Sequence, residues 1–180
     1  MSGGWEVNIE IDYSMVPTNV MDCIYAIDDG AIYKFVAYLG SQLVRGYNHA
    51  VVAEQIYEDT KVKNVVLIEC YEDLDEICTV SSIDNLITGG KNNNEVVVEV
   101  GDDINDEAKK SFDDTFDVTT NNYTIAAVAL LGYRRINGVI MERYYLVEAT
   151  PLTDNDDPKS VSIISIIDSE NVFYEVSKII

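Results

Sequence analysis

The chain of 180 residues carries 32 acidic and 12 basic side chains, so its formal net charge is −20. Such a charge repels polyanions, which argues against direct binding to nucleic acid and against attachment to anionic membranes. No apolar run approaches the roughly 18 residues of a membrane-spanning helix. The polar, acidic start predicts a cytoplasmic protein, or a secreted one if a signal peptide was removed. The acidic excess fits simple solubility, and it also fits a basic protein partner.

The first predicted elements are a strand and a helix. Residues 5–13 alternate apolar and polar side chains, which is the period of a half-buried strand. A helix is expected to begin at Thr18 or Asn19, whose side chains can cap it, and to end at Gly30. Its apolar stripe has helical spacing and consists of Val20, Cys23, Ile24 and Ile27.

Four more strands are predicted in the first half because these runs are rich in β-branched and aromatic residues. They cover residues 31–39, 47–58, 62–71 and 77–83. Residues 40–46 are expected to form a hairpin loop, and the glycine- and asparagine-rich residues 85–94 a linker. Cys70 and Cys78 are expected to face each other across the last hairpin, either as a disulfide or as two reduced thiols.

The second half repeats this order of elements. A strand at 95–100 precedes a predicted helix, whose apolar stripe is Ala108, Phe112, Thr115 and Phe116. Strands follow at 123–131, 139–149, 161–168 and 172–177. Four residue pairs share one offset of 92 positions: Leu39 with Leu131, Gly40 with Gly132, Val44 with Ile136, and Gly46 with Gly138. We therefore predict an internal repeat with units at residues 1–88 and 89–180, the alternative being two unrelated β-rich halves.

A motif in the first half resembles a known family. Gln42-Leu43-Val44-Arg45-Gly46 fits the Gln-x-Val-x-Gly signature of the cystatins, and Asn48 fits its common continuation. Gly3-Gly4-Trp5 resembles the glycine-bearing amino-terminal trunk of plant cystatins. In the second half, residues 134–138 keep the hydrophobic residue and the glycine of the signature and lose the glutamine. The alternative to a signature is an ordinary hairpin bulge with structural glycines.

The resemblance implies both a fold and a mode of binding. The implied fold is α+β, with two tandem cystatin-like units, each an antiparallel sheet packed around one helix, the second unit being degenerate. Cystatins inhibit papain-like cysteine proteases with a wedge made of the amino-terminal glycines and two hairpin loops. Carried over, the wedge residues are Gly3, Gly4, Gln42, Leu43, Val44, Arg45, Gly46 and, in the second loop, Leu74. That second loop, residues 71–76, has four acidic residues and no tryptophan.

The sequence offers no catalytic constellation, so we expect a binding protein without enzymatic activity, cofactor or metal. His49 is the only histidine and is expected at the surface or an edge. Residues 154–157 supply oxygen ligands but lack the pattern of a calcium loop, which favours a solvated acidic turn. Two functions remain: a cystatin-type inhibitor, or an acidic interaction protein, such as a mimic of nucleic-acid charge, that blocks a basic protein. The sequence does not determine the oligomeric state.

Overall fold

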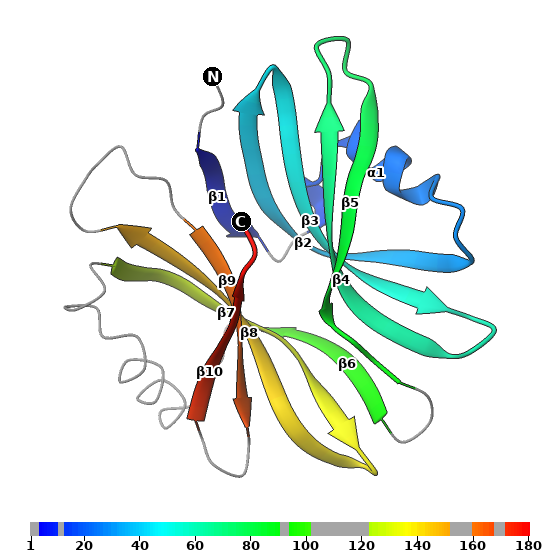
Figure 1. The fold of residues 1–180 in the computed structure, drawn as a ribbon, viewed down its shortest axis with the longest axis vertical. Helices are drawn as coiled ribbons and strands as arrows, with labels where there is room; N and C mark the ends of the chain where they lie inside the picture. Colours follow the sequence, from blue (N-terminus) through cyan, green and yellow to red (C-terminus); the bar gives the residue numbers. More distant parts are fainter. Residues whose placement is uncertain (1–3, 11–12, 91–93, 102–122, 152–159, 168–171) are drawn as a thin grey trace.

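The computed structural model describes residues 4–10, 13–90, 94–101, 123–151, 160–167 and 172–180. In this part of the chain the strands form two five-stranded antiparallel sheets (Figure 1). The first sheet contains β1 (Trp5–Glu10), β2 (Ala31–Val44), β3 (Gly46–Tyr57), β4 (Val62–Glu72) and β5 (Cys78–Ile87). The second contains β6 (Asn94–Gly101), β7 (Tyr123–Ile136), β8 (Val139–Pro151), β9 (Ser160–Ile167) and β10 (Val172–Lys178). A 3₁₀ turn, η1 (Tyr13–Met15), and a helix, α1 (Thr18–Tyr25), connect β1 to β2.

Both sheets are meanders, since each strand pairs with the next one along the chain. In each sheet the first strand approaches the second closely at a glycine of the second strand. Val7 pairs with Gly40 in the first sheet, and Val98 pairs with Gly132 in the second, each next to a register shift. A Cβ atom on Gly40 would lie 2.0 Å from the Glu6 carbonyl oxygen, and one on Gly132 would lie 2.3 Å from that of Val97. Only glycine permits these close approaches, so Gly40 and Gly132 have the same structural role in their respective sheets.

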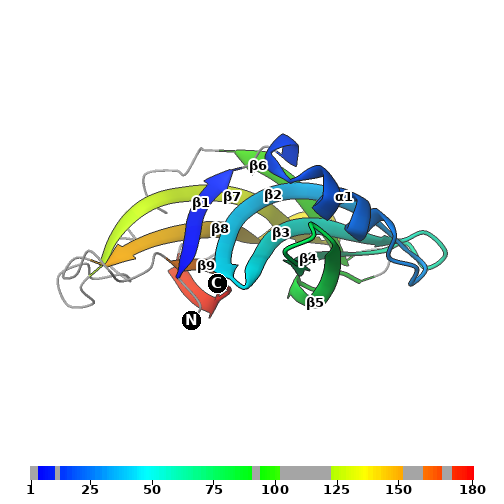
Figure 2. The ribbon, with the colours of Figure 1, turned by 90° about the horizontal axis from the view of Figure 1, so that it is seen from above.

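The central strands β3 and β4 of the first sheet are buried on both faces. On β3, Ala50 and Val52 belong to the core shared with the second sheet, whereas Val51 and Ala53 belong to the core beneath α1. This arrangement explains the almost uninterrupted apolar runs of β3 and β4, which resemble those of strands covered on both sides. Figure 2 shows the strong curvature of β2 and β3.

The core shared by the two sheets joins the two halves of the chain. It includes Leu39 and Leu67 of the first sheet and Leu131, Leu146 and Ile163 of the second, each at most 4% exposed. The residues between the sheets are also packed closely. A Cβ atom on Gly89 would lie 1.8 Å from the Lys63 carbonyl oxygen, so the connection between β5 and β6 runs directly against β4.

The predicted α+β class, with two tandem cystatin-like units that each pack a sheet around one helix, is wrong. Among the described residues the chain is mostly strand, and α1, with 8 residues, is its only α-helix. The first sheet therefore packs its second face on another sheet and is not simply wrapped around a helix. The second predicted helix, with its stripe at residues 108–116, lies outside the described residues. None of the helical segments seen here has the length and apolarity needed to cross a membrane.

The boundaries of α1 also differ from the prediction. Pro17 occupies the N-cap and no side chain caps the helix, so neither Thr18 nor Asn19 has the predicted capping role. The Asn19 side-chain oxygen accepts from the adjacent Val20 N–H at 3.0 Å, and its NH₂ group donates to Glu72. The helix stops at Tyr25 with Ala26 as its C-cap, several residues before Gly30. Val20 and Ile24 form its fully buried face, and a helix of only two turns has few further side chains to bury.

Candidate protein-binding edge

The segments predicted to form a wedge lie side by side at one end of the first sheet. Gly4 directly precedes β1, and Trp5 pairs with Gln42 at the end of β2. At the same end, Tyr47 pairs with Glu72, and Glu72 pairs with Cys78 across the next turn. The start of β1, the β2–β3 tip and the β4–β5 turn are thus aligned at the top of Figure 1. Gly3 lies outside the described residues.

The β2–β3 hairpin is longer and tighter than predicted. Residues 40–44 continue β2, and Arg45 alone forms the tip between the paired residues Val44 and Gly46. The expected loop at 40–46 is therefore wrong, because Gly40 serves a close approach between strands and not a turn. Leu43 is 57% exposed while its neighbour Val44 is partly buried, since successive strand residues point to opposite faces.

Polar contacts fix the β2–β3 tip on the sheet. The Asn48 amide donates to the Gln42 side-chain oxygen at 3.0 Å, so two residues of the motif hold each other across the hairpin. The Tyr71 hydroxyl of β4 donates to the Arg45 carbonyl oxygen. Gly46 has a φ of +113°, and a Cβ atom there would lie 2.2 Å from the Glu72 carbonyl oxygen. Gln42 and Gly46 therefore have structural roles, whatever binds at the tip.

The β4–β5 turn, residues 73–77, is organised by the Asp73 carboxylate. One of its oxygens accepts from the backbone N–H groups of Asp75 at 2.9 Å and Ile77 at 3.0 Å. The Asp73 N–H also donates to the Ile77 carbonyl oxygen at 3.0 Å. The turn holds Leu74 outward at 73% exposure and Ile77 at 62%. A single acidic residue of this loop thus shapes the turn and presents two apolar side chains.

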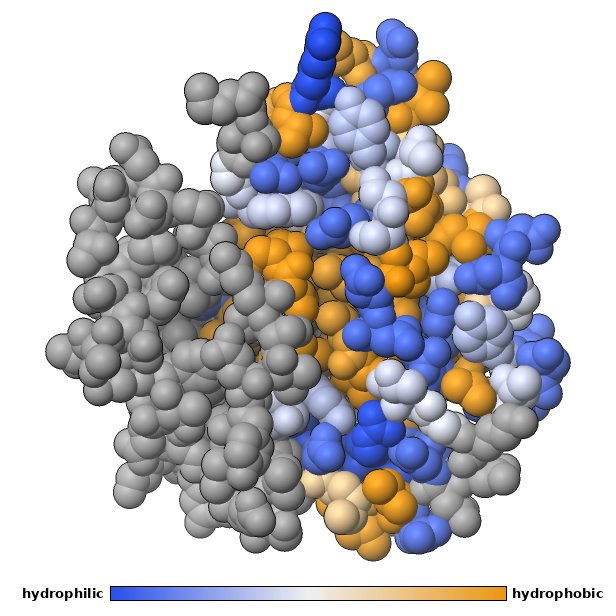
Figure 3. Space-filling view, in the orientation of Figure 1, coloured by the Kyte–Doolittle hydropathy of each residue, from blue (hydrophilic) through white to orange (hydrophobic). Residues whose placement is uncertain are grey.

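Four large hydrophobic side chains are exposed at this end of the first sheet. Leu43, Tyr47, Leu74 and Ile77 are all among the exposed large hydrophobic residues of the described chain. In Figure 3 hydrophobic and hydrophilic residues alternate at the top, where these segments lie. Exposed apolar groups on preorganised turns, bordered by charges, are typical of a protein-binding surface. We call this set of residues, with Gly4, Gln42, Val44, Arg45 and Gly46, the wedge edge.

His49 was wrongly expected at the surface, since it is only 5% exposed within β3. Its Nδ1 atom lies 2.8 Å from the Tyr38 hydroxyl, and its Nε2 atom lies 2.8 Å from a carboxylate oxygen of Glu72. The other Glu72 oxygen accepts from the Asn19 amide at 2.7 Å. Strands β2, β3 and β4 and helix α1 therefore meet in one polar network directly below the β4–β5 turn.

The network sets the ionisation of its members. The hydrogen bond from His49, opposed by partial burial and supported by Asn19, lowers the pKa of Glu72 below its ordinary value of 4.5. Burial raises the pKa of Tyr38 to about 12, so its hydroxyl stays protonated at neutral pH. The sequence offered one signal for this network, a lone histidine within a strongly apolar strand, but not the identity of its partners.

Burial disfavours the thiolate forms of Cys70 and Cys78. Cys23, Cys70 and Cys78 are free, and Cys70 pairs with Val80 while Cys78 pairs with Glu72, so the two predicted partners do not face each other. Burial raises the pKa of Cys70 to about 12 and that of Cys78 to about 11. Such thiols are protonated and poorly nucleophilic at neutral pH.

No group of metal-ligating side chains that could hold an ion is found within the described residues. The acidic residues 154–157, weighed as calcium ligands from the sequence, lie outside them.

Comparisons with known proteins identify no relative. No protein-family model matches the chain, and no curated protein or solved structure is significantly similar to it. The resemblance to cystatins is thus carried by the motif at residues 42–48 and stays a prediction.

Proposed function

We propose that the protein inserts the wedge edge into the cleft of a protein partner, in the manner of a cystatin-type inhibitor of papain-like cysteine proteases. The observation that supports this proposal most is the alignment of three segments at one end of the sheet, with Leu43 at the middle segment and Leu74 at the third. An inhibitor of this kind needs exposed apolar points on a rigid frame, because ordering flexible loops on binding costs affinity.

The rigidity of the wedge edge supports the same proposal. The Gln42–Asn48 hydrogen bond and the Tyr71 contact hold the first tip, and Asp73 holds the second turn. Below them, the His49–Glu72 pair links both hairpins to α1 through Asn19. Because these turns are already ordered in the free protein, little binding free energy would be spent on ordering them in a complex.

The test is titration of papain with the purified chain and with two matched variants. Leu43→Asp places a charge at the wedge edge, whereas Val139→Asp does so at the β7–β8 turn, where Val139 is 58% exposed against 57% for Leu43. We expect Leu43→Asp to weaken inhibition by at least about 10-fold, because the new charge must be desolvated, and Val139→Asp to leave it unchanged. No inhibition at micromolar protein, or equal effects of both variants, contradicts the proposal.

A second candidate function is the blocking of a basic protein. It is favoured by Asp75 and Glu76, which directly follow Leu74 in the exposed turn and have no ion-pair partner among the described residues. Binding of this kind would weaken steeply with salt and with the pair of changes Asp75→Asn and Glu76→Gln. A complex that is insensitive to salt and sensitive to Leu43→Asp would argue for the wedge instead.

A further inference from the structure

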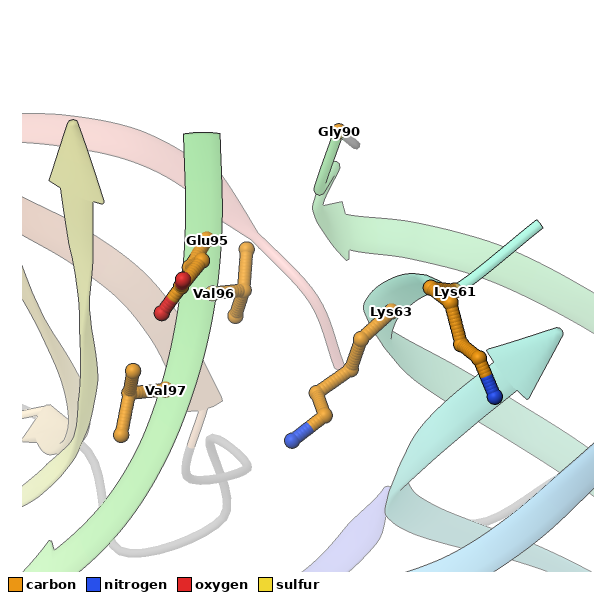
Figure 4. A pocket seen from close by; sticks show the side chains of 6 residues that line it. All are labelled: Lys61, Lys63, Gly90, Glu95, Val96 and Val97. Carbon is orange, nitrogen blue, oxygen red and sulfur yellow. The ribbon is translucent and has the colours of Figure 1, made fainter. Parts of the chain in front are cut away.

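A second site lies at the other end of β4, where the two sheets meet. A cavity of about 350 Å³ is lined by Lys61, Lys63, Gly90, Glu95, Val96 and Val97. Lys63 belongs to β4 and the two valines to β6, so both sheets contribute (Figure 4). The distance along β4 from Lys63 to Glu72 is about 30 Å at the usual rise of a strand, which separates this cavity from the wedge edge.

The charge facing this cavity is positive, although the chain as a whole is strongly acidic. Figure 4 shows the Lys63 side chain extending toward β6 and the Glu95 carboxylate turned away from both lysines. That carboxylate lies 2.6 Å from the Arg135 guanidinium, which satisfies it outside the cavity. Two of the 12 basic side chains of the chain therefore line one cavity whose single acidic residue is already paired.

Both ammonium groups can still donate hydrogen bonds to a ligand. Lys61 is exposed and has no ion-pair partner among the described residues. Lys63 lies 3.1 Å from a Glu54 oxygen, with its side chain 35% exposed. Such a partly exposed pair contributes little binding energy, and an ammonium group keeps further N–H donors. The repulsion from distant acidic residues is screened beyond about 10 Å at 0.1 M salt, whereas the lysines would touch the ligand.

We propose that this cavity binds a small organic anion. Its carboxylate or phosphate group would contact Lys63, with the exposed Lys61 side chain turning toward it from the mouth of the cavity, and its apolar part would lie against Val96. Val96 is 4% exposed and provides a firm wall, with the backbone of Gly90 at the end of the cavity. The volume suits a metabolite-sized molecule. Because the lining comes from both sheets, the bound anion stabilises their junction.

The experiment is a titration of the full chain followed by amide chemical shifts at 0.1 M salt. Pentanoate and pentyl phosphate provide the two anionic groups on one apolar tail, while acetate lacks the tail and 1-pentanol lacks the charge. We expect saturable shifts at residues 61–63 and 95–97, with a dissociation constant of about 1 mM for the better of the two anions. Acetate and 1-pentanol are expected to bind at least 10-fold more weakly. The preferred anionic group then distinguishes a carboxylate from a phosphate ligand.

Two variants and a control decide whether the lysines are responsible. Lys61 has a φ of 61°, so Lys61→Asn removes the charge with a residue that tolerates this conformation. Combined with Lys63→Gln, it is expected to weaken binding of the better anion at least 10-fold. Arg45→Gln removes a positive charge from the wedge edge, at the far end of the first sheet, and is expected to leave anion binding at this cavity unchanged. Three results would overturn the proposal, whatever the outcome with papain. They are equal weakening by Arg45→Gln, binding of 1-pentanol as tight as that of the anions, and absence of saturation.

Discussion

At the residue scale, the main feature is the partly buried contact between His49 and Glu72. An ion pair or charged hydrogen bond at this depth is stable only because each group has further partners, Tyr38 for the histidine and Asn19 for the carboxylate. Glu72 is also the last residue of β4, directly before the Asp73 turn. The network therefore joins the interior of the sheet to the wedge edge.

Replacing Glu72 is expected to make stability depend less on pH. The pKa of Glu72 is lowered in the folded chain, so its contribution is present above 4.5 and is lost as the pH falls through its folded value. Glu72→Gln should thus reduce the free energy of unfolding by about 1 kcal/mol at pH 7. The difference from the wild type should shrink as the pH falls below 4.5. Urea unfolding at several pH values measures both, and a constant difference down to pH 3 would refute the assignment.

Gly46 is expected to tolerate no side chain. Gly46→Ala places a Cβ atom against the Glu72 carbonyl oxygen at a φ of +113°, so the tip must shift, at about 2 kcal/mol or more. Gly138→Ala is the matched control, because Gly138 also has a positive φ, +80°, but nothing lies within 4 Å of the added atom. We expect the control to lose about 1 kcal/mol by urea unfolding. Equal losses would show that the clash does not matter.

At the element scale, the sequence predicted the strands of the first sheet well and the β2–β3 hairpin poorly. Alternation and β-branched residues located the strands of the first sheet to within a few residues. These patterns reflect directly which side chains of a strand face the core. The pattern could not show that Gly40 lies inside β2, since a glycine that allows a close approach looks the same as one in a loop. It also could not bring Asn19, Tyr38 and Glu72 to His49, because such contacts depend on the register of three strands and the docking of α1.

The burial of β3 on both faces leads to a test at the element scale. Val51 and Val52 are neighbours that are both fully buried, one beneath α1 and the other between the sheets. We expect Val51→Ala and Val52→Ala each to reduce the free energy of unfolding by about 2 kcal/mol, from lost methyl groups and the cavities left behind. Ile32→Ala, at a 43% exposed position of β2, is the control and should lose much less. A small effect at either valine would mean that one face of β3 is not packed.

At the scale of the whole molecule, the two halves depend on each other. The predicted boundary at residues 88 and 89 falls in the short connection between β5 and β6, yet the largest apolar core lies between the two sheets. Leu39 and Leu67 of the first half are buried against residues of the second half, including Leu131 and Leu146. Two sheets that share a core of this kind are expected to unfold in one cooperative transition.

The fragment 1–88 should therefore not behave as an independent domain. Without β6–β10, the face of the first sheet that carries Leu39, Val52 and Leu67 is left exposed to water. We expect the fragment to bind a hydrophobic dye and to self-associate in sedimentation experiments, with a melting temperature well below that of the full chain. Leu131→Ala in the full chain provides the complementary measurement, because damage to the second sheet should lower the single transition seen by probes in the first. A soluble monomeric fragment with an unchanged melting temperature would instead mean that the first sheet is stable without its partner.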